Sequence, residues 1–171
     1  MKHITSLAAL LVIFATSRSA EAGGQEGSIG VGAEFGLATI LDDVNLGGAS
    51  VNYDAGMFHV GGFLGFADPE GADNTRYAIG GRFFYHVHQM ASSDFSVGGN
   101  VGVLSIPIGG DPDNERATLM YIEPSFQIRA FLATNVALSF TGGLVIGAID
   151  TSGLAIGASP SGNAGFHYYF F

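Results

Sequence analysis

The strongest constraint on the fold is a period-two alternation of apolar residues with small or polar ones, which recurs along most of the chain. In residues 75–90, TRYAIGGRFFYHVHQM, the odd positions carry mostly large apolar side chains, whereas Arg76, Arg82, His86 and His88 all fall at even positions. Successive side chains of a β-strand point to opposite faces, so this spacing predicts a strand with one apolar and one polar face.

The alternation recurs in eight segments, with frequent glycine and no long helical pattern, and this predicts an all-β, up-and-down antiparallel meander. The predicted strands cover about 28–41, 48–53, 57–67, 75–88, 95–106, 117–130, 136–149 and 156–171. Short connections are predicted at 54–56, 89–94 and 133–135, and longer, acidic connections at 42–48, 68–74 and 107–116. Short and long connections therefore alternate along the chain.

The first 22 residues have the pattern of a secretory signal peptide. A basic head precedes the apolar core LAALLVIFA, and Ala20-Glu21-Ala22 is a small-x-small cleavage site. The core is too short to span a bilayer as a helix. The expected organisation is a signal peptide over 1–22 and one domain over 23–171.

Composition narrows the function classes. After residue 22 the chain has no lysine and four arginines against fourteen acidic residues, a net charge of −10 that makes binding to a nucleic-acid backbone improbable. The chain has no cysteine, which excludes disulfides, thiolate metal sites and a lipid-attachment cysteine.

The polarity of the second strand face decides which face meets the surroundings. That face is dominated by Gly, Ala, Ser and Thr, and most acidic residues fall in the long connections. A water-exposed face would carry many more charges, so the apolar face is expected to point outward into hydrocarbon, with Tyr77 and Tyr85 near the membrane interfaces. The alternative is a soluble, lipocalin-like barrel whose apolar face surrounds a ligand.

An eight-stranded barrel encloses only enough room for its own side chains. The inward face is therefore expected to hold small residues and a few long polar ones that neutralise one another. The candidates for this lumenal polar network are Glu34, Arg76, Arg82, Glu123 and Arg129.

With its signal peptide, eight alternating segments and aromatic end GFHYYFF, the chain resembles the small eight-stranded outer-membrane β-barrels of bacteria, the OmpA/OmpX-like group. The resemblance implies a transmembrane β-barrel in the outer membrane of a Gram-negative bacterium, exported through the periplasm, with the short turns on the periplasmic side. It also implies that Tyr169 and Phe171 match the signal read by the barrel-assembly machinery. Phe166, Tyr168 and Phe170 form an equally aromatic opposite phase, so either set could face lipid.

Three histidines, His59, His86 and His88, fall near the short turn after residue 88. As i, i+2 residues of one strand, His86 and His88 would share a face, and with His59 they could bind a transition metal. No ligand-spacing motif supports a metal, so the favoured interpretation is a polar plug or belt at the periplasmic rim, with no metal and no cofactor.

A lipid A-modifying enzyme would need a Ser or His nucleophile system beside an acid on the lipid-facing wall. Ser125 lies two residues from Glu123, and His167 lies near the chain end, but no Ser–His pair has motif-like spacing. No catalytic residue is therefore assigned. The acidic segment DPDNE, 111–115, lacks the features of an EF-hand and suggests at most weak cation bridging to lipopolysaccharide.

The expected function is that of a monomeric, non-enzymatic outer-membrane barrel with a structural or surface-interaction role and a polar, largely filled lumen. Its expected partners are outer-membrane lipid, lipopolysaccharide and the barrel-assembly machinery. Two alternatives remain open: a narrow pore gated by the lumenal Arg/Glu network, and a lipid A-modifying enzyme.

Overall fold

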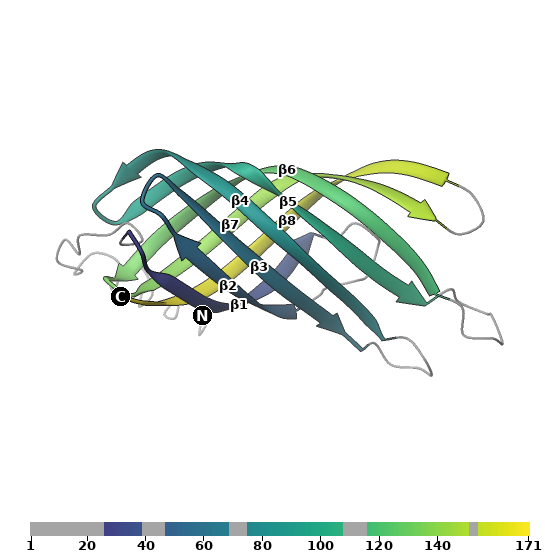
Figure 1. Ribbon diagram of the computed structural model, residues 1–171, viewed down its shortest axis with the longest axis horizontal. Helices are drawn as coiled ribbons and strands as arrows, with labels where there is room; N and C mark the ends of the chain where they lie inside the picture. Colours follow the sequence, from purple (N-terminus) through teal and green to yellow (C-terminus); the bar gives the residue numbers. More distant parts are fainter. Residues whose placement is uncertain (1–25, 39–46, 69–74, 108–115, 151–153) are drawn as a thin grey trace, which may run out of the picture.

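A computed structural model describes residues 26–38, 47–68, 75–107, 116–150 and 154–171 of the chain. Within them, eight strands run in sequence order around a closed antiparallel barrel in which β1 also pairs with β8 (Figure 1). The strands are β1 (Ile29–Ala38), β2 (Gly47–Asp54), β3 (Phe58–Ala67), β4 (Arg76–Met90), β5 (Ser93–Pro107), β6 (Arg116–Ala133), β7 (Val136–Asp150) and β8 (Leu154–Phe170). The predicted up-and-down eight-stranded barrel is confirmed.

The short connections gather at one end of the barrel, which we call the turn end; the opposite end is the loop end. They cover residues 55–57, 91–92 and 134–135, and the C-terminus lies at this same end (Figure 1). Gly56 turns the chain between β2 and β3 with a φ of 80°, a backbone conformation that glycine adopts without strain. The predicted signal peptide and acidic segment 111–115 lie outside the described residues, as do most residues of the long connections.

None of the described residues forms a helix long and apolar enough to cross a membrane.

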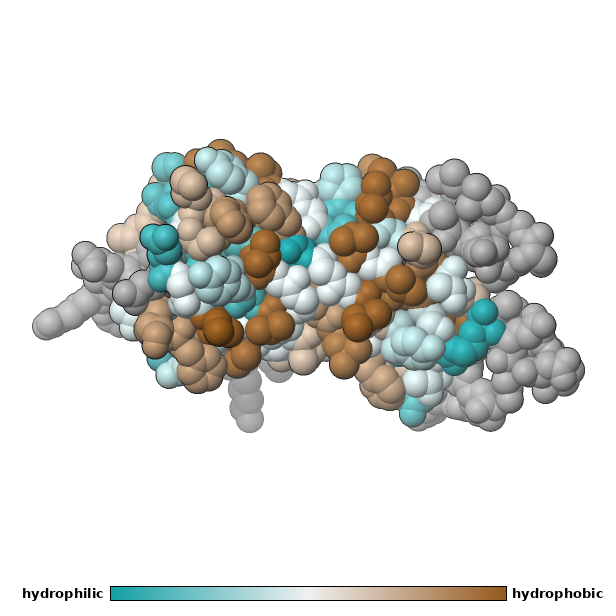
Figure 2. Space-filling model, viewed as in Figure 1, coloured by the Kyte–Doolittle hydropathy of each residue, from teal (hydrophilic) through white to brown (hydrophobic). Residues whose placement is uncertain are grey.

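Large apolar side chains cover the outside of the barrel (Figure 2). On β4 the outward residues are Tyr77, Ile79, Phe83, Tyr85 and Val87, as the odd-numbered phase predicts. The other strands present the same kind of surface, with Met120, Ile122, Phe126 and Ile128 on β6 as a second example. A continuous apolar surface of this extent is unsuited to water and fits a hydrocarbon environment.

The interior is layered along the barrel axis. Toward the loop end, an apolar cluster lies in the lumen; its members are Ala78, Leu104, Leu119, Tyr121 and Val145, with Phe63 and Ile106 packed against them. The middle and the turn end hold buried polar and charged side chains, together with a small cluster of Phe131, Ala137 and Tyr169. The lumen is therefore only partly polar, whereas the sequence predicted an inward face of small residues with a few long polar ones and no apolar layer. Tyr121 and Leu119 share the inward phase of Glu123, so period two alone could not separate apolar from polar layers.

The last strand resolves the choice between its two aromatic phases. Phe166, Tyr168 and Phe170 point outward, and Phe170 is 56% exposed. Tyr169 instead lies inside the barrel and is 1% exposed, whereas Phe171 follows the strand and is exposed. The two residues that match the assembly signal therefore do not share a surface.

A β-bulge in β4 separates two of the candidate histidines. His86 pairs with Ser96 on β5, but His88 pairs with Phe95, so Val87 is an extra residue in the ladder. Such a bulge changes the phase of the side chains that follow it. His86 is buried and His88 is exposed, and the prediction that they share a face is wrong for this reason.

Glycines on the inner face make room for large interior side chains. A Cβ atom added at Gly30 would lie 2.7 Å from Cε1 of the Tyr169 ring, and one added at Gly102 would lie 2.8 Å from the hydroxyl oxygen of Tyr121. Both distances are shorter than a Cβ atom can tolerate to a non-bonded carbon or oxygen atom. These glycines therefore set where the lumen can hold an aromatic ring.

We expect Gly30→Ala to destabilise the barrel by about 1–3 kcal/mol, because the added methyl group must displace the Tyr169 ring. Urea titration of the folded barrel in detergent measures the change. Gly62→Ala is the matched control, since its Cβ would meet nothing closer than the Gly80 carbonyl oxygen at 3.5 Å. Equal stability of the two variants would contradict the close approach at Gly30.

Candidate functional site

Arg129 lies at the centre of a buried polar cluster at the turn end. Its guanidinium, carried by β6, is 1% exposed and reaches three other strands through charged or hydroxyl partners. Nη2 donates to Asp54 Oδ2 at 2.8 Å, Nε donates to Asp94 Oδ2 at 2.9 Å, and Nη1 donates to the Tyr169 hydroxyl at 2.9 Å. One side chain thus connects β6 to β2, β5 and β8.

The two carboxylates that hold Arg129 stand at strand ends beside short turns. Asp54 ends β2, and its Oδ1 accepts the Gly56 backbone N–H at 2.9 Å, so the same side chain shapes the turn and binds the guanidinium. Asp94 is the second residue of β5, and its Oδ1 also accepts from Ser96 at 3.4 Å. Both carboxylates are almost fully buried, where a charge must be paired to be tolerated.

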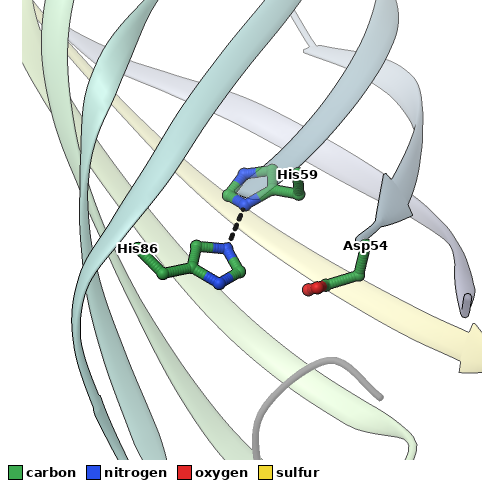
Figure 3. Close-up of side chains that lie close together, drawn as sticks. All are labelled: Asp54, His59 and His86. Carbon is green, nitrogen blue, oxygen red and sulfur yellow. Dashed lines mark hydrogen bonds between the residues drawn. The ribbon is translucent and has the colours of Figure 1, made fainter. Parts of the chain in front are cut away.

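Two imidazoles complete this cluster (Figure 3). His59 on β3 and His86 on β4 face each other, with Nδ1 of His59 2.8 Å from Nε2 of His86, and the Asp54 carboxylate points toward them. Ligand atoms of Asp54, His59 and His86 all lie within 4.8 Å of one another. We refer to these three residues and Arg129 as the turn-end cluster.

The hydrogen bonds of His86 define which ring nitrogen carries its proton. Nε2 lies 3.0 Å from Arg129 Nη2, which can only donate, so Nε2 is the acceptor nitrogen and the proton of the neutral ring is on Nδ1. Nδ1 lies 2.9 Å from the Gly56 carbonyl oxygen, its acceptor, and also 2.9 Å from the Gln89 amide nitrogen. His59 Nδ1 lies 2.8 Å from Nε2 of His86 and shares its one lone pair with Arg129 Nη2.

A second ion pair crosses the middle of the lumen. Arg82 on β4 donates Nη1 and Nη2 to the two carboxylate oxygens of Glu34 on β1, at 2.6 and 2.7 Å. This bidentate geometry is the strongest that an arginine and a carboxylate can form. The structure thus brings together two residues of the predicted network.

Glu123 and Arg76 do not join the ion pairs that the sequence suggested. Glu123 on β6 accepts from Asn100 Nδ2 at 2.9 Å and from the Ser161 hydroxyl, in place of Arg82 or Arg129. Arg76 is the first residue of β4 at the loop end, far along the strand from Arg82. The sequence predicted one network, but the structure has two separate arginine sites, at Arg82 and Arg129, and a glutamate, Glu123, that is hydrogen-bonded elsewhere.

The sequence analysis missed the two carboxylates that pair with Arg129. It assigned Asp54 and Asp94 to turns because aspartate is common there. Their positions carried a usable signal, since Asp54 continues the inward phase of Ser50 and Asn52, and Asp94 continues that of Ser96. An aspartate at the inward-facing end of a strand can thus accept hydrogen bonds both from a lumenal side chain and from the backbone of the adjacent turn.

The lumenal trio of Ser50, His167 and Glu34 does not have the geometry of a nucleophilic relay, and the serine on the other ring nitrogen of His167, Ser139, is 3.5 Å away. His167 Nε2 lies 2.8 Å from the Ser50 hydroxyl and 3.2 Å from Glu34 Oε1, so both partners contact the same ring nitrogen. A relay needs the nucleophile and the acid on opposite nitrogens. The trio and Ser125 also lie on the inner face of the strands, away from the lipid-facing wall on which a lipid-modifying enzyme would act.

We expect Arg129→Gln to destabilise the barrel by about 3–5 kcal/mol, because it leaves Asp54 and Asp94 buried without their counter-ion. Denaturant unfolding in detergent measures the loss. Arg116→Gln serves as the control, since Arg116 is exposed at the start of β6 and should change stability by less than about 1 kcal/mol. Similar losses in the two variants would show that Arg129 does not hold the cluster.

The chain is similar to known proteins in structure but not in sequence. No family model matches the chain, and no curated protein matches it. Among solved structures, the N-terminal β-barrel domain of Pseudomonas aeruginosa OprF is similar with a TM-score of 0.61 and 11% identity, over 85% of this chain and 98% of that one. Outer membrane protein H (OprH) of P. aeruginosa, solved in DHPC micelles, is similar with a TM-score of 0.57 and 12% identity, over 84% and 99%. With its closed eight-stranded topology, apolar exterior and charged interior, the chain has the same fold as these small eight-stranded outer-membrane barrels.

Proposed function

We propose that this protein is an integral barrel of the Gram-negative outer membrane that acts as a structural or surface-interacting element. The observation that carries the proposal is the filled lumen of a barrel whose outside is apolar. Such a barrel can anchor its connections in the bilayer without needing a ligand or substrate inside.

Two independent layers of side chains fill the lumen. At the turn end, the cluster around Arg129 joins four strands through hydrogen bonds to Asp54, Asp94 and Tyr169. Toward the loop end, Leu104, Leu119 and Tyr121 belong to an apolar cluster of buried residues. A solute that passed along the lumen would meet both layers, and this packing supports a structural role over transport.

A narrow pore is the second candidate, and the Glu34–Arg82 pair is the observation that favours it. The pair lies in the polar middle of the lumen, and the Glu34 side chain is the less buried partner at 16% exposure. A charged pair in this position could exchange partners with neighbours such as His167 and leave room for ions. The apolar cluster toward the loop end argues against this candidate.

The proposal includes the partners expected from the sequence. Outward-facing Phe166, Tyr168 and Phe170 supply an aromatic surface on the last strand, on which the barrel-assembly machinery and lipid could act, with Phe171 at its end. Lipopolysaccharide is the proposed partner of the acidic connections, including residues 111–115, which lie outside the described part of the chain.

Heat-modifiability tests the membrane-barrel proposal. We expect the chain without residues 1–22, refolded in detergent, to migrate as a compact β-rich form that converts to a slower form only on boiling, because the closed hydrogen-bond ladder resists detergent. Gel mobility and circular dichroism before and after heating provide the measurement. A chain that folds in buffer without detergent would contradict the proposal.

Conductance in planar lipid bilayers separates the structural role from the pore. We expect no stable channel from the wild-type barrel and none from Arg82→Ala, because the apolar layer of Leu104, Leu119 and Tyr121 remains in place. Arg116→Ala is the control for loss of an arginine outside the lumen. Conductance in the wild type that Arg82→Ala abolishes or enlarges would favour the pore.

A further inference from the structure

We propose that the turn-end cluster binds a divalent transition-metal ion of the Zn²⁺ class through Asp54, His59 and His86. These residues come from the end of β2, the start of β3 and the late part of β4, and all three are buried. Their ligand atoms already lie within 4.8 Å of one another (Figure 3). Two imidazoles and one carboxylate, with a fourth position open to water, form a donor set that Zn²⁺ commonly accepts.

The hydrogen bonding of His86 supports a ligand role. Its Nδ1–H donates to the Gly56 carbonyl at 2.9 Å, which fixes the ring and directs the Nε2 lone pair at His59 and Asp54. Metal-binding histidines nearly always donate their second ring N–H to a carbonyl or carboxylate in this way. This hydrogen bond orients His86 as a metal ligand would be oriented, and it is an observation separate from the distances among the three ligands.

The charge of the turn-end cluster and its surroundings also favours an added cation. Two buried carboxylates, Asp54 and Asp94, face one guanidinium, Arg129, which leaves a surplus of one negative charge while the imidazoles are neutral. Buried charge without a counter-charge is unfavourable. The surplus attracts a cation to the space between Asp54, His59 and His86, where a divalent ion changes the net charge from −1 to +1.

Arg129 can make way for the ion without losing its own anchorage. Its Nη2 contacts Asp54, His86 and Asp94, the last at 2.7 Å. Its Nε also donates to Asp94 at 2.9 Å, and its Nη1 donates to Tyr169 at 2.9 Å, so these two nitrogens can hold the guanidinium in place. The Nη2 contacts with Asp54 and His86 compete with the metal. His59 binds by moving its ring proton from Nδ1 to Nε2, so no proton need leave the protein.

The nitrogen donors set the metal class. Imidazole suits Zn²⁺, Cu²⁺ and Ni²⁺, whereas Ca²⁺ and Mg²⁺ prefer sites built from oxygen alone. We therefore expect Zn²⁺ to bind, and Ca²⁺ and Mg²⁺ to leave the cluster unchanged.

Titration of the folded barrel in detergent with ZnCl₂, followed by calorimetry, tests the proposal. We expect one ion per barrel, and we expect His59→Asn and His86→Asn each to weaken binding by more than about a hundredfold. That loss exceeds the roughly 10–100-fold typical of replacing a residue that only hydrogen-bonds to a metal ligand. His88→Asn is the matched control, since His88 is an exposed histidine on the same strand and should change affinity less than about twofold. Gel mobility before and after heating verifies that each variant is folded.

Two results would overturn the proposal. One is the absence of Zn²⁺ binding by the folded wild-type barrel, and the other is binding that depends on His88 instead of the buried pair. If the buried variants do not fold, electron paramagnetic resonance of Cu²⁺ added to the wild-type barrel decides the question. Coupling to two imidazole nitrogens would support the site, and fewer than two would refute it.

Discussion

The barrel interior depends on the pairing of Arg129 with two aspartates. A guanidinium that is 1% exposed would be strongly unfavourable alone, and Asp54 and Asp94 would be equally unfavourable without it. Because the aspartates stand beside different short turns, their pairing with Arg129 also fixes how those turns sit against the lumen. The same ion pairs therefore neutralise the buried charges and hold the short turns in place.

The two arginines of the lumen solve the same problem in different ways. Arg82 forms a bidentate pair with one carboxylate, Glu34, and this pair spans the lumen between β4 and β1. Arg129 divides its donors among several acceptors and thereby brings two aspartates and His86 together at the turn end. The first arrangement neutralises charge locally, whereas the second leaves excess negative charge next to two imidazoles. This difference is why the proposed metal site belongs to the Arg129 cluster.

The apolar layer toward the loop end argues against ion passage through the lumen. Polar side chains alone could rearrange around passing ions, but Leu104, Leu119 and Val145 offer ions no replacement for hydration. Inward glycines such as Gly102 allow this layer to form, because they leave space for the aromatic ring beside them. The proposed structural role therefore rests on packing as much as on charge pairing.

The sequence by itself determined the strands, their order and the outward direction of their apolar faces. Period two is a local property, and an aqueous surface could not accommodate so many apolar residues with so few charges. It also placed Arg82, Arg129, Glu34 and Glu123 inside. Only the tertiary structure decided that Arg129 pairs with Asp54 and Asp94. It also decided that a bulge turns His88 outward and that Tyr169 points inward. The physical reason is that closure of the barrel sets the register between strands far apart in sequence, and this register determines which inward side chains meet across the lumen.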